Sequence, residues 1–262
     1  MDQDNYLQIA KKAILAPQEF ILKNFGKDLK PEIVDDHDLK IPVDKKVEKV
    51  IIDVIKREFP EHGFDSEEFG KDGSEKEFVW YIDPLDGTNN YVPGIPYFGS
   101  SIALVHKHEC IISMIHNPFL KKTYHAIKGF GAYLNDEKLV CQNNKNDLRK
   151  ATMSFIRGHR SITDPKLKKE GDELEMFVER KFRRVLKMWC PVLDWGLLAE
   201  GRIDAAISFE DEPQEEFAGT LLAQEAGLEV YNFDGSRYNG SDHKVIACNS
   251  FLLKDLCSLV SK

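Results

Sequence analysis

Two aspartates on one short turn, Asp83 and Asp86, are the residues of this sequence whose types and spacing point most directly to chemistry. Two ionised carboxylates so close together repel each other unless a cation lies between them. Gly87 follows and allows a ligand to approach the backbone closely, and the hydroxyl of Thr88 can hold a water molecule or begin a helix. The turn therefore predicts a site for a hard metal ion bound through oxygen ligands.

A strand is expected to position this turn. Residues 78–82, Phe-Val-Trp-Tyr-Ile, are apolar, aromatic and β-branched, a composition typical of strands. Because Pro84 lacks an N–H group and has a fixed φ, we expect regular pairing to stop after Asp83. The strand would then present the Asp83 carboxylate at its C-terminal edge.

Two acidic residues upstream have simple structural interpretations. Residues 44–59 carry apolar side chains at helical spacing, and Pro60 follows them, so a helix is predicted there. Asp44 stands at its start, where an aspartate is most simply an N-cap. Glu67 lies in a charged stretch and, taken alone, is typical of solvated surface.

Other ligand-binding motifs are absent from the sequence. An EF-hand starting at Asp83 would need a glycine at its sixth position and a glutamate at its twelfth, where Thr88 and Gly94 stand. No P-loop, Gly-x-Ser-x-Gly or His-Glu-x-x-His pattern occurs. Clustered Asp and Glu instead suit Mg²⁺, and two such ions can activate water and stabilise the leaving oxygen of a phosphoester.

The turn and its surroundings resemble the inositol monophosphatase family. Residues 83–91, Asp-Pro-Leu-Asp-Gly-Thr-Asn-Asn-Tyr, are similar to that family's first signature, Asp-Pro-Ile/Leu-Asp-Gly-Thr followed by Asn and an aromatic residue. Further segments follow the same order and extend the resemblance over most of the chain: 44–49, 59–62, 67–68, 201–205 and 219–227.

The resemblance implies a set of ligands for two or three Mg²⁺ ions per site. Glu67, Asp83 and the Leu85 carbonyl would hold the first ion, and Asp83 with Asp86 would hold the second. These roles give Glu67 a function beyond that of a surface residue.

One implied ligand departs from the family's pattern. Where the second signature has an aspartate after a tryptophan, this sequence has Glu215 after Gln214. Glutamate can still bind Mg²⁺, but its extra methylene moves the carboxylate. Asp211 or Glu216 could substitute for it.

The resemblance also implies roles in water attack and phosphate binding. Asp44 and Thr88 would polarise the attacking water, with the Thr88 hydroxyl hydrogen-bonded to Asp44. The backbone amides of Gly87 and Thr88 would bind phosphate oxygens, with Asp86 beside the substrate.

The wall that would contact the rest of the substrate differs from the family's pattern. Ser208 stands where inositol-specific members tend to carry a glutamate, and Trp189-Cys190-Pro191 replaces a segment of small residues. We therefore expect Trp189, Cys190 and Ser208 to shape the substrate pocket. A phosphatase is indicated more strongly than a phosphatase specific for inositol.

Composition narrows the class of protein. The chain has 262 residues, of which 42% are hydrophobic and 31% charged, as in a soluble globular protein. Its net charge of −8 argues against nucleic acid or an anionic membrane as a partner. The five cysteines form no Cys-x-x-Cys motif, the acidic N-terminus does not resemble a signal peptide, and no apolar run could span a membrane. We expect a cytoplasmic protein with reduced thiols.

The order of the expected elements indicates a layered α/β protein. Strands and helices alternate after the polar run 142–150, while 29–40 and 211–216 are expected to be loops. We expect an N-terminal α+β half at 1–150 that carries the metal-binding signature, and a C-terminal α/β half at 151–262 that closes the active site. The resemblance implies an αβαβα five-layer sandwich and a homodimer.

Together these expectations predict Mg²⁺-dependent hydrolysis of a small phosphorylated metabolite, an inositol monophosphate-like compound or a sugar phosphate, by metal-activated water. A nucleotide 3′-phosphatase, a fructose-1,6-bisphosphatase and a histidinol-phosphate phosphatase would share the same metal core. A non-catalytic binding or regulatory descendant of the fold is the alternative of a different class, motivated by Glu215 and Trp189. The resemblance also implies sensitivity to lithium.

Overall fold

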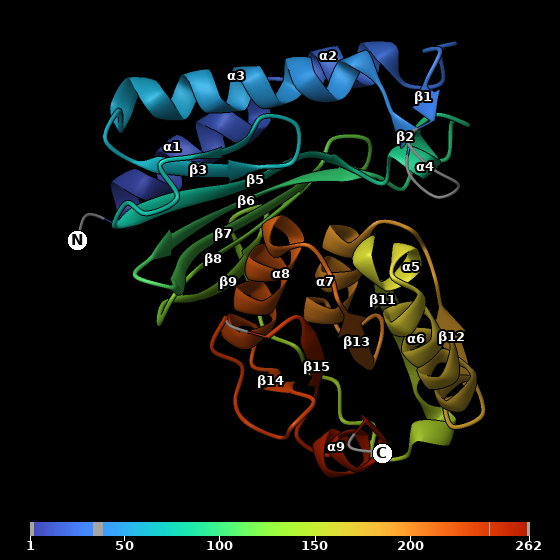
Figure 1. Cartoon of the computed structure of the whole chain (residues 1–262). Coiled ribbons are helices and arrows are strands. Elements are labelled where there is room, and N and C mark those ends of the chain that lie inside the picture. The colour runs from blue at the N-terminus through green and yellow to red at the C-terminus, as the bar shows by residue number, and fades with distance from the viewer. Residues whose placement is uncertain (1–2, 34–38, 241, 261–262) are drawn as a thin grey trace.

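Helices and β-sheets alternate in five layers (Figure 1). A computed structural model describes residues 3–33, 39–240 and 242–260. An eight-stranded sheet and a five-stranded sheet form the second and fourth layers. The helices of the first, third and fifth layers are, in turn, α1 (Gln3–Leu15) and α3 (Pro42–Glu58), α7 (Pro191–Ala199) and α8 (Pro213–Glu225), and α6 (Pro165–Glu179) and α9 (Leu253–Val260). The predicted αβαβα architecture is confirmed.

The eight-stranded sheet has the order β10-β9-β8-β7-β6-β5-β3-β4, and only β3 and β5 pair in parallel. Strands β5 to β10 are neighbours in chain order and form a meander. The strands are β3 (Gly63–Ser66), β4 (Gly70–Asp72), β5 (Phe78–Asp86), β6 (Gly99–His106), β7 (Glu109–Asn117), β8 (Lys122–Ile127), β9 (Gly131–Leu134) and β10 (Glu137–Leu139).

Helices α1 and α3 cover the outer face of this sheet. Val47, Ile51 and Ile55 recur every four residues along α3 and are fully buried, so the apolar stripe seen in the sequence is the face that packs on the sheet. Pro17 separates α1 from α2 (Gln18–Asn24).

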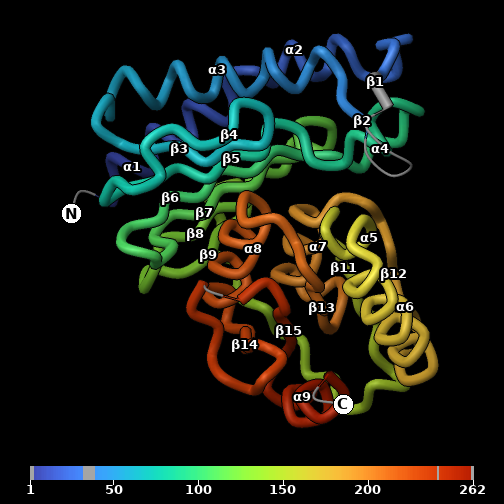
Figure 2. Tube along the Cα trace, viewed as in Figure 1, coloured from blue at the N-terminus to red at the C-terminus, as the bar shows by residue number. Residues whose placement is uncertain are grey.

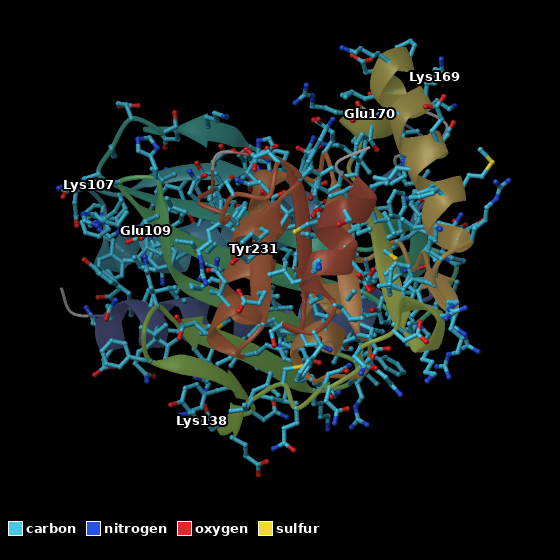
Figure 3. The ribbon with its side chains drawn as sticks, turned by 90° about the horizontal axis from the view of Figure 1, so that it is seen from below. Lys107, Glu109, Lys138, Lys169, Glu170 and Tyr231 are labelled. Atoms are coloured by element: carbon cyan, nitrogen blue, oxygen red, sulfur yellow. The ribbon has the colours of Figure 1, made fainter. Side chains whose placement is uncertain are left out.

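The five-stranded sheet has the order β12-β11-β13-β15-β14. In β13, Ala206 joins the core shared with α7 and α8, while Ala205 and Ile207 face the core under α6 and α9, as strand alternation requires. Seen from below in Figure 3, the labelled residues of α6 and of the β6–β7 turn lie at opposite ends of the molecule. The strands are β11 (Thr152–Arg157), β12 (Arg184–Leu186), β13 (Ala205–Phe209), β14 (Glu229–Asn232) and β15 (Lys244–Cys248).

Helices α7 and α8 join the two sheets. Trp195 of α7 packs so closely on Gly219 of α8 that a Cβ at Gly219 would lie 2.2 Å from the indole ring. Only glycine fits there. Ser101 and Ser113 of the first sheet donate hydrogen bonds to the carbonyls of Gln214 and Ala218, at 2.9 and 2.6 Å. The start of α8 is therefore fixed against β6 and β7.

Strand β5 is longer than predicted. It runs through Pro84 to Asp86, and its pairing with β6 is irregular between Asp83 and Asp86. The missing N–H of Pro84 falls within this irregular stretch, and its carbonyl accepts a hydrogen bond from Ser100 Oγ at 2.6 Å. Proline is thus accommodated where the ladder is already broken.

Two predicted loops contain regular structure. Short strands β1 (Glu32–Ile33) and β2 (Leu39–Lys40) pair within the segment 29–40, whose residues 34–38 lie outside the described residues. Helix α8 begins at Pro213, so four of the six residues of the expected acidic loop, 213–216, form its first turn. Proline at the first helical position and acidic residues after it are favourable at a helix start.

Two further observations concern the chain as a whole. The boundary expected near residue 150 falls in the stretch between the two sheets, and the division into two domains remains a prediction. Among the helices of the described residues, none combines the length and apolar character needed to cross a membrane.

Candidate metal centre and active site

A cavity of about 590 Å³ lies where the two halves of the chain face each other. Its lining comes from the end of β5, from α4 (Thr88–Tyr91), from β11, from α5 (Arg160–Thr163) and α6, and from the starts of α7 and α8. In Figure 2 the end of β5 and α4 lie above α5 and α7. The cavity is thus built from segments far apart in the sequence.

Three carboxylates meet in this cavity. Oxygen atoms of Asp83, Asp86 and Glu215 all lie within 4.8 Å of one another. Two come from the end of β5 and one from the first turn of α8. The structure therefore brings Glu215 to the Asp83 turn, as the sequence predicted.

The backbone around Asp83 leaves one of its oxygens available. Asp83 Oδ1 accepts a hydrogen bond from the Leu85 amide at 2.9 Å, which fixes the turn. Asp83 Oδ2 is buried and has no hydrogen-bond partner among the described residues. Desolvation and the neighbouring Asp86 charge raise the pKa of Asp83 well above its usual value.

Asp86 links the two halves of the chain. Its Oδ2 accepts a hydrogen bond from the amide of Val192 at 2.8 Å, at the start of α7. Pro191 occupies the first helical position and has no N–H group that would need an acceptor. The N–H group of the next residue, Val192, is satisfied by the Asp86 carboxylate. A candidate metal ligand thus also caps the helix that carries the substrate wall.

Glu67 lies on the cavity wall, where the surrounding protein encloses its carboxyl group although part of the residue is exposed. Desolvation by the surrounding protein and the charge of Asp83 raise its pKa well above the usual value. Its loop is held by buried Glu48 of α3, whose carboxylate accepts hydrogen bonds from the amides of Glu68 and Phe69, both at 2.8 Å.

The position of Glu48 was not assigned from the sequence. The sequence feature that could have indicated it is the spacing: Glu48 stands four residues after Asp44 and falls on the same face of α3 as the buried residues Val47 and Ile51. A buried glutamate needs hydrogen-bond donors. The amides of the Glu67 loop supply them, so Glu48 is a positioning residue.

Asp44 has one occupied and one unpaired carboxylate oxygen. Oδ2 accepts a hydrogen bond from the Ile41 amide at 3.0 Å, while buried Oδ1 has no partner among the described residues. The predicted N-cap position is wrong, because α3 begins at Pro42 and its N-cap is Ile41; Asp44 is the third helical residue, and its side chain accepts the hydrogen bond from the N-cap amide. Desolvation, followed by the charges of Glu67 and Glu68, raises the pKa of Asp44 to about 8.

The Thr88 hydroxyl differs from the expected geometry. It donates to the Leu85 carbonyl at 3.0 Å rather than to Asp44, because α4 begins at Thr88 and brings that carbonyl within reach. Gly87 before it has φ +83°, and a Cβ there would lie 3.0 Å from the Tyr97 carbonyl oxygen. Glycine is needed at this turn for both reasons.

The three predicted wall residues have different environments. Trp189 has φ +54°, is 50% exposed and lines the cavity. Cys190 is buried at the N-cap of α7, with its thiol 3.6 Å from the Asp86 carbonyl oxygen. Cys190 is not among the described residues that line the cavity, so its predicted contact with substrate is not supported.

The prediction for Ser208 is also not supported. Ser208 is fully buried in β13 and is not part of the described cavity lining, whereas Glu212 in the following loop is. The sequence position of Ser208 does not show that β13 still continues there and buries the side chain.

Of the two alternatives to Glu215 as a metal ligand, Asp211 and Glu216, one lies in the cavity wall and the other does not. Glu216 Oε1 accepts a hydrogen bond from the Tyr238 hydroxyl at 2.9 Å and lies 3.5 Å from His243 Nδ1, and Glu216 does not belong to the described lining of the cavity. Asp211, in contrast, lines the cavity.

Asn90 holds the substrate wall against the turn. Its amide donates hydrogen bonds to the carbonyls of Tyr97 and Met188, at 2.9 and 2.8 Å. Asn90→Ala should lower the free energy of unfolding by about 1–3 kcal/mol, because these carbonyls lose their donor. Urea denaturation measures this, with exposed Asn144→Ala as the control. Equal stabilities of the two variants would contradict the prediction.

The donor set fits Mg²⁺. Its members are hard oxygen ligands, and the unpaired Asp83 Oδ2 and Asp44 Oδ1 are buried polar atoms that call for a partner. Desolvation, followed by repulsion from the neighbouring carboxylates, raises the pKa of Asp83 and of Glu215 well above the usual values. A divalent cation would relieve both effects.

Comparison with known proteins assigns the chain to a family. A sequence profile described as the inositol monophosphatase family matches residues 2–262. The chain belongs to the inositol monophosphatase family. The resemblance stated from the Asp83 turn is therefore confirmed over the whole sequence.

Individual relatives carry two kinds of name. A fructose-1,6-bisphosphatase/inositol-1-monophosphatase from Aquifex aeolicus is 36% identical over 252 residues, which cover 94% of this chain and 92% of the relative. The Nus factor SuhB from Escherichia coli is 30% identical over 259 residues, covering 95% and 92%. An inositol monophosphatase structure from Anabaena matches with a TM-score of 0.86 at 25% identity, over 100% of this chain and 97% of that one.

Proposed function

We propose that this member of the inositol monophosphatase family is a Mg²⁺-dependent phosphomonoesterase that hydrolyses a small phosphorylated metabolite. The observation that carries the proposal is the meeting of Asp83, Asp86 and Glu215 within 4.8 Å, on the wall of a cavity large enough for such a substrate. Glu67 and the Leu85 carbonyl complete the proposed oxygen ligands.

The residues around this site would have different roles in hydrolysis. Bound Mg²⁺ would supply Lewis-acid activation of water and of the phosphate. Asp44, with its unpaired Oδ1, would accept the proton of the attacking water, and the Thr88 hydroxyl would orient that water. The backbone of Gly87 and Thr88 would hold phosphate oxygens beside Asp86. No covalent intermediate on the protein is required.

Basic residues line the cavity as well as acidic ones. Arg157, Lys168 and Lys187 line the cavity in a chain whose net charge is −8. Arg157 pairs with Asp172 at 2.5 Å and Lys187 pairs with Glu175, so these side chains are held in place. Because Asp172 and Glu175 also line the cavity and pair with these cations, bound Mg²⁺ would have to offset the remaining acidity for an anionic substrate.

A substrate panel tests the proposal. Phosphate release would be measured with inositol 1-phosphate, fructose 1,6-bisphosphate, a nucleoside 3′,5′-bisphosphate and histidinol phosphate, with Mg²⁺ and with EDTA. We expect Mg²⁺-dependent turnover of at least one compound. Metal binding without turnover of any compound would instead favour a binding or regulatory protein, the alternative suggested by relatives named Nus factor SuhB.

Trp189 is proposed to select among these substrates. Its half-exposed ring lines the cavity, and its removal would take away contact area for the part of the substrate beyond the phosphate. Trp189→Ala should raise KM about tenfold with little change in kcat, which corresponds to about 1.4 kcal/mol of lost binding. Trp189→Phe should restore part of the affinity. Unchanged KM for every substrate would contradict this role.

Three further properties are proposed from family membership rather than from geometry. We propose a homodimer, a cytoplasmic location and inhibition by lithium. Gel filtration with light scattering, fractionation of cells, and titration of the phosphatase reaction with LiCl test them in turn. The net charge of −8 supports the prediction that nucleic acid is not a direct partner.

A further inference from the structure

One buried carboxylate at the metal centre has no role in the function described so far. Asp211 lies in the loop between β13 and α8, is 3% exposed, and lines the cavity. Neither oxygen of its carboxylate has a hydrogen-bond partner among the described residues. A buried, unpaired carboxylate is costly, so its presence calls for a ligand that neutralises it.

The cations near Asp211 are engaged by other acids. Arg160 lies 3.3 Å from Glu210, His243 lies 3.5 Å from Glu216, and Lys71 lies 3.2 Å from Asp65. The charges of Glu212 and Glu216 repel Asp211 further. Within the described part of the chain, no side chain is recorded as an ion-pair partner of Asp211.

The charge of Asp211 is directed at the metal centre. After desolvation, it is the largest charge that raises the pKa of Glu215, and the largest that raises the pKa of Asp86. Asp211 precedes Glu212, the N-cap of α8, and its side chain interacts directly with that of Glu215 in the first turn of the helix. Asp211 therefore lies beside the Asp83, Asp86 and Glu215 cluster, on the wall of the same cavity.

The backbone holds Asp211 rigidly in this position. Gly158 packs directly beneath it, and a Cβ at Gly158 would lie 1.7 Å from the Glu210 carbonyl oxygen and 2.7 Å from Asp211 Cα. The Gly158 amide also donates to the Phe209 carbonyl at 3.1 Å. The loop cannot easily swing Asp211 away into solvent.

We infer that Asp211 is an additional metal-binding carboxylate of this cavity, which acts with Glu215 on a divalent cation beside the Asp83, Asp86 and Glu215 cluster. The inference rests on the proposed metal-dependent phosphatase site. It also explains how the site accommodates a glutamate at position 215. The longer Glu215 side chain moves one carboxylate away from the place of an aspartate, and Asp211 supplies a second carboxylate from the same side of the cavity.

Binding of Mn²⁺ alone, followed by electron paramagnetic resonance, tests the inference without turnover. Asp211→Asn should weaken the binding of at least one Mn²⁺ ion by tenfold or more, since even residues that only support a metal ligand contribute about 10–100-fold. Glu210→Gln is the matched control, because Glu210 is the neighbouring acid and pairs with Arg160 at 3.3 Å instead. The control should bind Mn²⁺ like the wild type.

The double variant Asp211→Asn with Glu215→Gln makes the test sharper. If both carboxylates bind the same ion, the second substitution should weaken Mn²⁺ binding less than it does alone, because the shared site is already damaged. Strictly additive effects would contradict a shared ion.

Thermal unfolding separates ligation from a structural role. In EDTA, Asp211→Asn should unfold at a higher temperature than the wild type, because a buried unpaired charge is removed; its stabilisation by Mg²⁺ should be smaller. A structural role would lower the unfolding temperature equally with and without Mg²⁺, and would overturn the inference. If Asp211→Asn does not fold, Asp211→Ser provides the same comparison.

The outcomes distinguish this inference from the proposed function. Wild-type binding of Mn²⁺ by Asp211→Asn would overturn the inference and leave the phosphatase proposal intact. Weakened binding in that variant, together with a wild type that hydrolyses no substrate, would support the inference and count against the phosphatase proposal.

Discussion

Asp83→Asn should reduce Mg²⁺-dependent phosphate release by at least about 100-fold, because Asp83 is the carboxylate proposed to bridge two ions. Asparagine keeps the shape of the side chain but removes the charge of the buried oxygen that has no partner. The loss should be largest at low Mg²⁺ and should shrink only in part at high Mg²⁺. Initial rates measured across a Mg²⁺ titration give the result.

Asp83→Asn should lower the activity without lowering the stability of the protein. In EDTA, Asp83→Asn should be at least as stable as the wild type, since one of the repelling charges is gone. Asp72→Asn, at an exposed aspartate of the same sheet, should change neither activity nor stability noticeably. Wild-type rates for Asp83→Asn at low Mg²⁺ would exclude the proposed bridging role.

Without Mg²⁺, the protein should lose stability as the pH rises from about 6.5 to about 8. The pKa of Asp44 is raised to about 8 and that of Asp211 to about 7, whereas an aspartate in the unfolded chain has a pKa of about 3.9. Between these values the folded state binds more protons than the unfolded state. Stability therefore falls as the pH rises through this interval, and it levels off once the folded carboxyls have lost their protons.

The pH window avoids the opposing contribution of buried histidines. The pKa of His116 is lowered to about 4 by burial, so this residue adds stability as the pH rises, but only up to its unfolded value near 6.5. Above about 6.5 the carboxyls dominate. Each difference of one in pKa between the two states corresponds to about 1.4 kcal/mol, so a drop of several degrees in the unfolding temperature is expected.

Mg²⁺ should reverse this dependence on pH. The ion binds deprotonated carboxylates, so its stabilising effect should grow from about pH 6.5 to about pH 8. Thermal unfolding in EDTA and in Mg²⁺ at several pH values measures both trends. Asp44→Asn should flatten the decline in EDTA. Rising stability over this range in EDTA would show that the acids are not protonated in the folded protein.

The sequence was informative where the signal is local. The strand type of residues 78–82, the close spacing of Asp83 and Asp86, and the apolar stripe of α3 depend on neighbouring residues, and the structure agrees with each of them. Family resemblance then supplied Glu215, which no local pattern could connect to a turn more than a hundred residues earlier.

The parts that were missed depend on contacts between distant segments. Pro84 suggested a strand end, but the side chain of Ser100 and an irregular ladder accommodate it. Cys190 and Ser208 were counted into the substrate wall, although residue spacing does not show which side chains a helix start or a strand turns inward. Asp211 could be named only as an alternative, because its importance depends on burial and on missing partners.

The hydrogen bond from Val192 to Asp86 has a consequence for how such a protein can diversify. It fixes the first turn of α7 to the metal-binding strand, so the residues immediately before that helix can change in size while the carboxylates stay in place. Trp189, in place of a small residue, is one such change. The proposed substrate wall and the proposed metal ligands can therefore change separately in this molecule, although their residues are neighbours in space.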